Sequence, residues 1–435
     1  MSRSATERLD VDVVVIGAGF AGLVAARELG RAGCTAAVLE ARDRIGGRTW
    51  VGPGLGLELE LGGGWVHWLQ PHVWAELRRY GIGLAEPRSV DVAISNFGGR
   101  RTREDASVFQ ARAIEAMRPL EEAARAVFPR PYEPLSRIDA VAALDHLNIP
   151  DGLEALGVAP AEIPLLASYW GGNVSGLATD GAITSVLRWI AVAGWDAELI
   201  DEAAGTYTIE GGTRRLVEAI RADVEAPVLL DAPVTRLDHG PDGVVAHANG
   251  ITVAARAAIV TVPWGALRQI TFAPGLGAAQ AAAARVGQAS RGVKAWVRIK
   301  GAGEKFLVMA EEGHPLNFVA VDRVEADSRL LVCFGPDAAA FDASPSGVQA
   351  TLRAYVPDAT VDEVALHDWC ADPYAGQTWL FMRPGQLLEA YPAFRRATGQ
   401  LFFAGGDYAD GWAGFMDGAV ESGLRAARLA ATAVL

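Results

Sequence analysis

The sequence has little cysteine and shows no pattern of metal ligands. Its 435 residues include three cysteines, at positions 34, 333 and 370, which lie far apart. None of them stands at a spacing typical of metal ligands, and no metal site is predicted. We expect all three to be small buried residues of a protein kept in a reducing, cytoplasmic environment.

The sequence also lacks an excess of positive charge and long apolar runs. It has 39 basic and 52 acidic residues, a net charge of −13, which disfavours nucleic acid or an anionic membrane as a partner. The first ten residues are polar and contain no apolar signal-peptide core. The alanine-rich segment Ala419–Leu435 carries Glu421, Arg425 and Arg428, which favours a packed helix over a membrane anchor. No Ser/His/Asp or paired-carboxylate signature is evident.

The most informative feature is a glycine-rich turn between a β-branched run and an apolar helical pattern, in Val11–Gly22. A strand, a tight turn and a helix N-terminus in this order are typical of dinucleotide binding. Gly17 permits the turn, Gly19 lets the backbone approach the phosphates, and Gly22 lets the helix pack on its strand. The turn residues predicted to contact a dinucleotide are Gly17, Ala18, Gly19, Phe20, Ala21 and Gly22.

A second predicted strand, Ala36–Leu39, ends in an acid at the expected distance from the glycine turn. Glu40 is suitably placed to accept hydrogen bonds from ribose hydroxyls. The turn, the helix, the second strand and the acid together predict a dinucleotide site. They leave open whether the dinucleotide is NAD or FAD.

Two further glycine clusters follow. In the first, formed by Glu40, Ala41, Arg42, Gly46, Gly47 and Arg48, the arginines are candidate pyrophosphate partners, with a solvated basic turn as the alternative. The second cluster, formed by Gly62, Gly63, Gly64 and Trp65, indicates close approach of backbone to something flat or bulky. A strand bulge is the alternative there, and we expect His67 to be a packed residue.

A chain of this length predicts two domains. Dinucleotide-domain patterns occur at the start, middle and end, so we predict a discontinuous α/β Rossmann-like domain from residues 1–80, 205–284 and 388–435. Residues 81–204 and 285–387 would form an α+β second domain of mixed sheet and helices. Glu104–Val127 is predicted as one helix, and Ile251–Val253 and Ala257–Val262 as separate strands.

These segments resemble the flavin-containing monoamine oxidase family over nearly the whole chain. The matching motifs are VVVIGAGFAGL, VLEARDRIGGRT, LELGGGWVHW, IEGGTRRLVEAI, LFFAGGDY and WAGFMDGAVESG. The soluble bacterial members, of the hydroxynicotine oxidase and cyclohexylamine oxidase type, look most similar. The resemblance implies FAD as the cofactor, and a second domain that shapes a substrate cavity.

The resemblance also implies roles for individual residues. Lys294 matches the lysine beside flavin N5, although a solvent-facing strand lysine is the alternative. Trp379 and Phe415 stand where the family has an aromatic cage, and Thr378 stands at the position of the flavin-attachment cysteine, so FAD would be noncovalent. Asn173 matches a substrate-binding asparagine. Further implied FAD contacts are Val234, Gly406, Asp407, Gly414, Phe415 and Met416, with a helix beginning near Asp417 aimed at the flavin.

The predicted reaction is oxidation of an amine to an imine by hydride transfer to flavin, followed by hydrolysis and reoxidation by oxygen to hydrogen peroxide. The predicted partners are an amine, hydrophobic and cyclic or aromatic, and oxygen, with a homodimer left open. An L-amino-acid oxidase remains possible on these motifs and would need a buried arginine, for which Arg188 is the candidate. An amine dehydrogenase with a protein acceptor, an NAD-dependent dehydrogenase and a catalytically silent flavoprotein also remain open.

Overall fold

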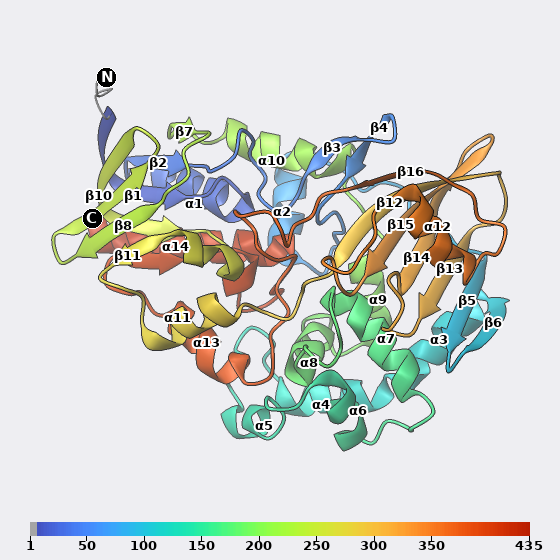
Figure 1. The fold of residues 1–435 in the computed structure, drawn as a ribbon. Coiled ribbons are helices and arrows are strands. Elements are labelled where there is room, and N and C mark those ends of the chain that lie inside the picture. Colours follow the sequence, from blue (N-terminus) through green and yellow to red (C-terminus); the bar gives the residue numbers. More distant parts are fainter. Residues whose placement is uncertain (1–6) are drawn as a thin grey trace.

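The computed structural model describes residues 7–435, which contain two large sheets of different character (Figure 1). The first sheet has eight strands in the order β11-β8-β9-β10-β1-β2-β7, with β17 paired to β10 as well. Its strands are β1 Glu7–Ile16, β2 Ala36–Leu39, β7 Val228–Leu229, β8 Arg236–Gly240, β9 Gly243–Ala248, β10 Ile251–Val260, β11 Thr271–Ala273 and β17 Leu401–Phe403.

Five strands of this sheet, β17, β10, β1, β2 and β7, are parallel to one another. Parallel strands are buried on both faces, which explains their continuous apolar runs. The side chains of Val13 and Val15 pack on one face with helices α1 Phe20–Arg31, α10 Gly212–Ala222 and α14 Met416–Val434. The side chains of Val14 and Ile16 enter the opposite core, which continues into the helices of the second part of the chain.

The second sheet has seven strands in the order β16-β12-β15-β14-β13-β5-β6. All neighbours are antiparallel except β13 and β5, which are parallel. The strands are β5 Val92–Phe97, β6 Arg100–Asp105, β12 Val293–Lys300, β13 Phe306–Ala310, β14 Phe318–Val324, β15 Ser328–Gly335 and β16 Val361–Leu366. A separate hairpin pairs β3 Val51–Gly54 with β4 Leu57–Glu60.

A group of helices lies along the lower part of the molecule in Figure 1, from below α13 (Gln386–Arg395) to the lower end of the second sheet. Its members are α3 Ala106–Ala116, α4 Arg118–Val127, α5 Ile138–Ala142, α6 Ile149–Ala155, α7 Ile163–Val174, α8 Ile183–Val192 and α9 Ala197–Gly205. The remaining helices are α2 Pro71–Arg79, α11 Ala278–Val286, α12 Pro345–Arg353 and α13 Gln386–Arg395, with short 3₁₀ turns η1 Trp264–Gln269 and η2 Gly406–Tyr408.

The predicted fold class is confirmed, while two element predictions are wrong. Glu104–Val127 is not one helix, because its start belongs to β6 and Pro119 in the first turn of α4 separates α4 from α3. The two strands expected between residues 251 and 262 are one long strand, β10. It pairs with β9 through its first half and with β17 through its second.

The strands of the first sheet all lie within the ranges predicted for the dinucleotide domain, and those of the second sheet within the other ranges. The exact domain limits stay a prediction. Within residues 7–435, no helix is both long and apolar enough to cross a membrane. In the same part of the chain, no group of His, Cys, Asp and Glu is arranged to hold a metal ion.

A buried ion pair fastens α1 to α2 and predicts a measurable effect on stability. Both terminal nitrogens of Arg27 donate to Glu76, at 2.6 and 2.7 Å, and both side chains are buried. Glu76→Ala leaves the guanidinium buried without this partner and should cost about 3–5 kcal/mol. The exposed Arg214–Glu58 pair is the matched control, and Glu58→Ala should cost less than about 1 kcal/mol. Equal thermal unfolding midpoints for the two variants would contradict this expectation.

Candidate active site

One continuous cavity of about 930 Å³ lies between the two sheets. Its wall includes the glycine turn after β1, the loop after β2, and side chains of the second sheet. The predicted site residues that line it are Gly17, Gly19, Phe20, Ala21, Glu40, Ala41, Arg42, Gly46, Gly47, Arg48, Gly62, Gly63, Gly64, Trp65, Asn173, Val234, Lys294, Trp379, Gly406, Gly414, Phe415 and Met416. Three further predicted contacts, Ala18, Gly22 and Asp407, do not line it.

The glycine turn lies at one end of the cavity, and a residue with a side chain would not fit at two of its glycines. Gly17 has φ +107°, and a Cβ on Gly22 would lie 1.9 Å from the carbonyl oxygen of Gly17. Gly22 therefore acts in packing α1 onto the turn, as the sequence predicted. Gly19 precedes the first turn of α1, whose N–H groups have no side-chain cap. Free N–H groups at a helix N-terminus favour an anion, such as a pyrophosphate.

Glu40 lies beside this turn with part of its hydrogen-bonding capacity already used. One carboxylate oxygen accepts from the N–H of Ala18 at 2.7 Å, and the other from the N–H of Arg42 at 3.0 Å. The side chain is buried yet lines the cavity. Since a carboxylate offers about four lone-pair sites, it can still accept from ribose hydroxyls.

The arginines of the segment from Glu40 to Arg48 are only partly exposed and contact protein groups, so this segment is not a solvated turn. Arg42 donates to the carboxylate of Asp372 at 2.7 Å. Arg48 donates to the carbonyl of Thr378 at 2.6 Å and to Asp407. Both line the cavity while paired within the protein. Binding of a pyrophosphate by Arg42 and Arg48 stays a prediction.

Arg44 is a residue of this segment that sequence reasoning missed. Its guanidinium donates to the carbonyls of Ile45 and Gly47 at 3.2 and 3.1 Å and lies 4.7 Å above the ring of Trp50. Burial lowers its pKa to about 10. Arg44 therefore holds the loop that carries Gly47 against the cavity. The sequence around Arg44 gives no sign that its side chain turns toward the carbonyls of its own loop and toward Trp50.

Asp407 is surrounded by protein groups and does not face the cavity. Its carboxylate accepts from Arg48, from the N–H of Trp264 at 3.1 Å and from the side-chain amide of Gln377 at 2.7 Å. It thereby joins the end of β17 to three segments that are distant in the sequence. Its predicted contact with flavin hydroxyls stays untested. Gln377 was not anticipated from the sequence.

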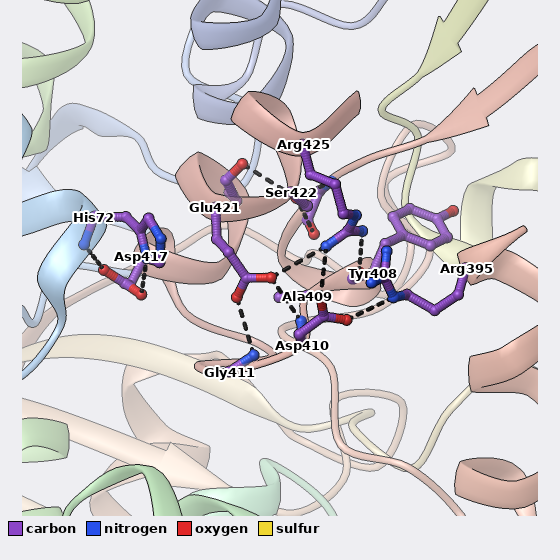
Figure 2. A network of polar contacts seen from close by, with 12 residues as sticks. His72, Arg395, Tyr408, Ala409, Asp410, Gly411, Asp417, Glu421, Ser422 and Arg425 are labelled. Atoms are coloured by element: carbon purple, nitrogen blue, oxygen red, sulfur yellow. Dashed lines mark hydrogen bonds and ion pairs between the residues drawn. The ribbon is translucent and has the colours of Figure 1, made fainter. Parts of the chain in front are cut away.

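Helix α14 begins at Met416, close to the predicted start, with no side-chain cap on its first turn. Met416 lines the cavity, so the positive end of the helix lies at its wall. Figure 2 shows that the acid of this first turn, Asp417, is directed at α2. It accepts from the N–H groups of His72 and Val73 at 2.6 and 2.9 Å. The hydrogen bond and charge of Asp417 raise the pKa of His72, against the lowering effect of burial.

The loop before α14 is held by a second part of the same network (Figure 2). Glu421 accepts from the N–H groups of Asp410 and Gly411, at 2.9 Å each. Asp410 in turn binds Arg395 at 2.7 Å and Arg425 at 3.4 Å. These contacts fix the backbone that leads to Phe415.

Lys294 lies on β12 and is buried, so the solvent-facing alternative is wrong. Its ammonium donates to the carbonyl of Gly62 at 2.7 Å and lies 4.8 Å from the ring centre of Trp65. Burial lowers its pKa to about 8. Because Ala295 and Val297 enter the apolar core behind the sheet, the alternation of β12 directs Lys294 and Trp296 to the cavity side.

The two residues predicted for the aromatic cage are both held in place by neighbours. The indole N–H of Trp379 donates to the carbonyl of Asn173 at 2.8 Å. Phe415 packs edge-on against Trp189 and Trp412, with ring centres 4.7 and 5.1 Å apart. The side-chain amide of Asn173 donates to the carbonyl of Tyr169, one helical turn earlier in α7, at 3.0 Å.

The site contains groups that fit a large polar ligand. The indole N–H of Trp65 and the hydroxyl of Thr378 line the cavity, are buried, and have no hydrogen-bond partner. Buried polar groups are normally paired, so both point to a missing partner. The glycine turn, Glu40 and the start of α14 add donors and acceptors along the same wall. The polarity of this set fits a dinucleotide flavin.

Arg188, the candidate for gripping a substrate carboxylate, does not line this cavity. It is buried in α8, donates to the carbonyl of Asp410 at 3.1 Å, and lies 5.6 Å from the ring centre of Tyr391. Burial lowers its pKa. Its contacts tie α8 to the loop before α14, so it has a structural role.

Comparisons with known proteins agree with the geometry. Pseudooxynicotine dehydrogenase of a Pseudomonas species is 34% identical over 95% of this chain and 85% of its own length. The (S)-6-hydroxynicotine oxidase of Paenarthrobacter nicotinovorans is 30% identical over 94% of this chain and 97% of its own. A structure of putrescine oxidase bound to putrescine superposes with a TM-score of 0.83 at 23% identity, covering 97% and 99% of the two chains.

The family model described as flavin containing amine oxidoreductase matches residues 20–431, nearly the whole chain. This match confirms the family resemblance seen in the motifs and agrees with a flavin as the cofactor. The chain therefore belongs to the flavin-containing amine oxidoreductases.

Proposed function

We propose that this chain is an FAD-dependent amine oxidase that converts a hydrophobic cyclic or aromatic amine to its imine. The observation that carries the proposal is the continuity of one cavity from the glycine turn to Lys294, Trp379 and Phe415. Bound FAD would accept the hydride from the carbon next to nitrogen and pass the electrons to oxygen. The imine would then hydrolyse in water to a carbonyl product.

The residues at the far end of the cavity orient the amine and exclude water. Trp379 and Phe415 provide an apolar cage without phenolic hydroxyls, which suits a neutral amine. A neutral amine needs no general base, in agreement with the lack of such a signature among the motifs. The ammonium of Lys294 would stabilise negative charge as electrons pass to oxygen.

The proposal is favoured over an amino-acid oxidase because Arg188 lies outside the cavity wall. An amine dehydrogenase is the second candidate, since one relative is named pseudooxynicotine dehydrogenase. As an amine dehydrogenase, this chain would perform the same amine oxidation and transfer the electrons to an acceptor other than oxygen. A cytoplasmic location and a homodimer remain expectations from the sequence.

Anaerobic stopped-flow mixing with a panel of amines tests the reaction class. Cyclic and aromatic amines should bleach the absorption band of the oxidised flavin at about 450 nm. The corresponding α-amino acids should not, because each described arginine that lines the cavity (Arg42, Arg48 and Arg88) is already paired with a carboxylate of the protein. Bleaching by amino acids alone, or by no compound of the panel, would contradict the proposal.

Lys294→Met should slow reoxidation of the reduced enzyme by oxygen roughly 100-fold or more, because it removes a preorganised charge. FAD binding should weaken far less. Since the pKa of Lys294 is about 8, its ammonium is present below this pH and lost above it. The wild-type reoxidation rate should therefore fall as pH rises through about 8, and the variant should lose this dependence.

Lys300→Met is the matched control, since Lys300 ends the same strand and is exposed. Its reoxidation rate and pH profile should equal those of the wild type. An unchanged rate in Lys294→Met would remove this residue from the oxygen reaction. Slow wild-type reoxidation by oxygen, with fast reoxidation by an added one-electron acceptor, would favour the dehydrogenase.

Thr378 predicts that FAD is held without a covalent bond at this position, because a hydroxyl cannot form the thioether that a cysteine forms. Acid precipitation should release all flavin into the supernatant, as judged by its fluorescence. The conservative variant Thr378→Ser should behave in the same way. Flavin retained in the washed pellet of the wild type would show that the noncovalent prediction is wrong.

A further inference from the structure

The substrate end of the cavity contains a polar cluster that the reaction proposed above does not use. Asp201 of α9, Tyr169 of α7 and Gln110 of α3 all line the cavity. One carboxylate oxygen of Asp201 accepts from the hydroxyl of Tyr169 at 2.7 Å, and the other from the amide of Gln110 at 2.8 Å. Three separate helices therefore fix the orientation of one carboxylate at the cavity wall.

Asp201 forms no ion pair with any lysine, arginine or histidine of residues 7–435. The charged groups that act on it are Glu198 and Glu202, both acidic and on its own helix. Burial raises the pKa of Asp201, and these acids raise it further, against the lowering effect of its two hydrogen bonds. A carboxylate in such surroundings gains free energy from a cation.

The basic residues that line the cavity have partners elsewhere. The partners are Asp322 for Arg88, the carbonyl of Gly62 for Lys294, Asp407 for Arg48 and Asp372 for Arg42. None of these groups neutralises Asp201. The cation that complements this carboxylate must therefore come with the ligand.

We propose that Asp201 binds a second, positively charged nitrogen of the substrate, at the end opposite the amine that is oxidised. The substrate class is then a diamine, or an aromatic amine with a second basic nitrogen. This proposal rests on the amine oxidase function proposed above and adds to it a specificity-determining residue.

The spacing along α7 indicates how the two nitrogens would be separated. Tyr169 contacts Asp201, and Asn173, one turn later, holds Trp379 through its carbonyl. One helical turn advances roughly 5 Å along the axis, so Asp201 and Trp379 contact neighbouring turns of α7 on the wall of the same cavity. A neutral nitrogen at Trp379 and a charged one at Asp201 would thus suit a molecule with a short spacer between them.

The test compares monoamines with matched diamines on the FAD-loaded enzyme. The pairs are butylamine and its terminal diamine, hexylamine and its terminal diamine, and benzylamine and para-(aminomethyl)benzylamine. Asp201→Asn removes the charge and keeps the shape of the side chain. Its amide oxygen can accept one of the two hydrogen bonds, and its amide nitrogen can donate to the hydroxyl oxygen of Tyr169 or, once the side-chain amide of Gln110 is turned over, to the oxygen of that amide. For the diamine that the wild type prefers, kcat/KM should fall about 10- to 100-fold in this variant, mainly through KM. The matched monoamine should change less than about twofold.

Glu115→Gln is the control, because Glu115 is an exposed acid on α3, the helix that carries Gln110, and is not among the groups that act on Asp201. It should leave the preference for the diamine in place. Absence of any diamine preference in the wild type, or an equal loss for both members of a pair in Asp201→Asn, would overturn the proposal.

Calorimetric titration under anaerobic conditions measures amine binding without turnover, so it tests the role of Asp201 independently of the proposed oxidation. Tighter binding of a diamine to the wild type than to Asp201→Asn supports the role of Asp201 even if no amine bleaches the flavin. Failure to bleach would then count against the oxidase function alone. Equal binding of monoamine and diamine by both proteins would reject the role of Asp201.

Discussion

The carboxylate of Asp407 is the interaction on which the geometry of the cavity depends. It accepts from Arg48 of the loop after β2, from the N–H of Trp264 after β10, and from Gln377 beside the cage segment. A buried carboxylate is costly unless its lone pairs are filled, so this residue requires all three segments to meet. The walls of the two sheets are thereby fixed relative to each other, and one cavity extends from the glycine turn to the aromatic residues.

The charges around this cavity differ in how they are compensated, and that difference separates structural from functional groups. Arg42, Arg48 and Asp407 are paired within the protein and shape the wall. The ammonium of Lys294 has a carbonyl and two indole rings but no carboxylate within ion-pair distance among its described contacts. Asp201 has hydrogen-bond donors but no cationic partner among residues 7–435. An uncompensated charge is destabilising in the empty site, and a ligand that neutralises it binds more tightly.

Much of the fold could be predicted because its signals are local. Gly17 and Gly22 allow the strand, turn and helix of the first βαβ unit, and β2 lies at Ala36–Leu39, as the sequence predicted. The break between α3 and α4 was missed, although Pro119 marks it, because the apolar pattern continues across it. The hairpin of β5 and β6 was missed because the charged strand β6 gains its pairing from a neighbour and not from its own residues.

The sequence by itself determined the family and the flavin fold, and it predicts which residues stand at the positions of the attachment cysteine and the cage. These follow from motifs in which each residue type meets a local steric or chemical demand. Only the tertiary structure decided that Lys294 faces the cavity, that Arg188 does not, and that Asp407 joins segments and does not line the cavity. It also brought Gln110, Tyr169 and Asp201 together. Such contacts join residues from separate helices and strands, and no local pattern encodes which side chains a packed fold will place within hydrogen-bonding distance.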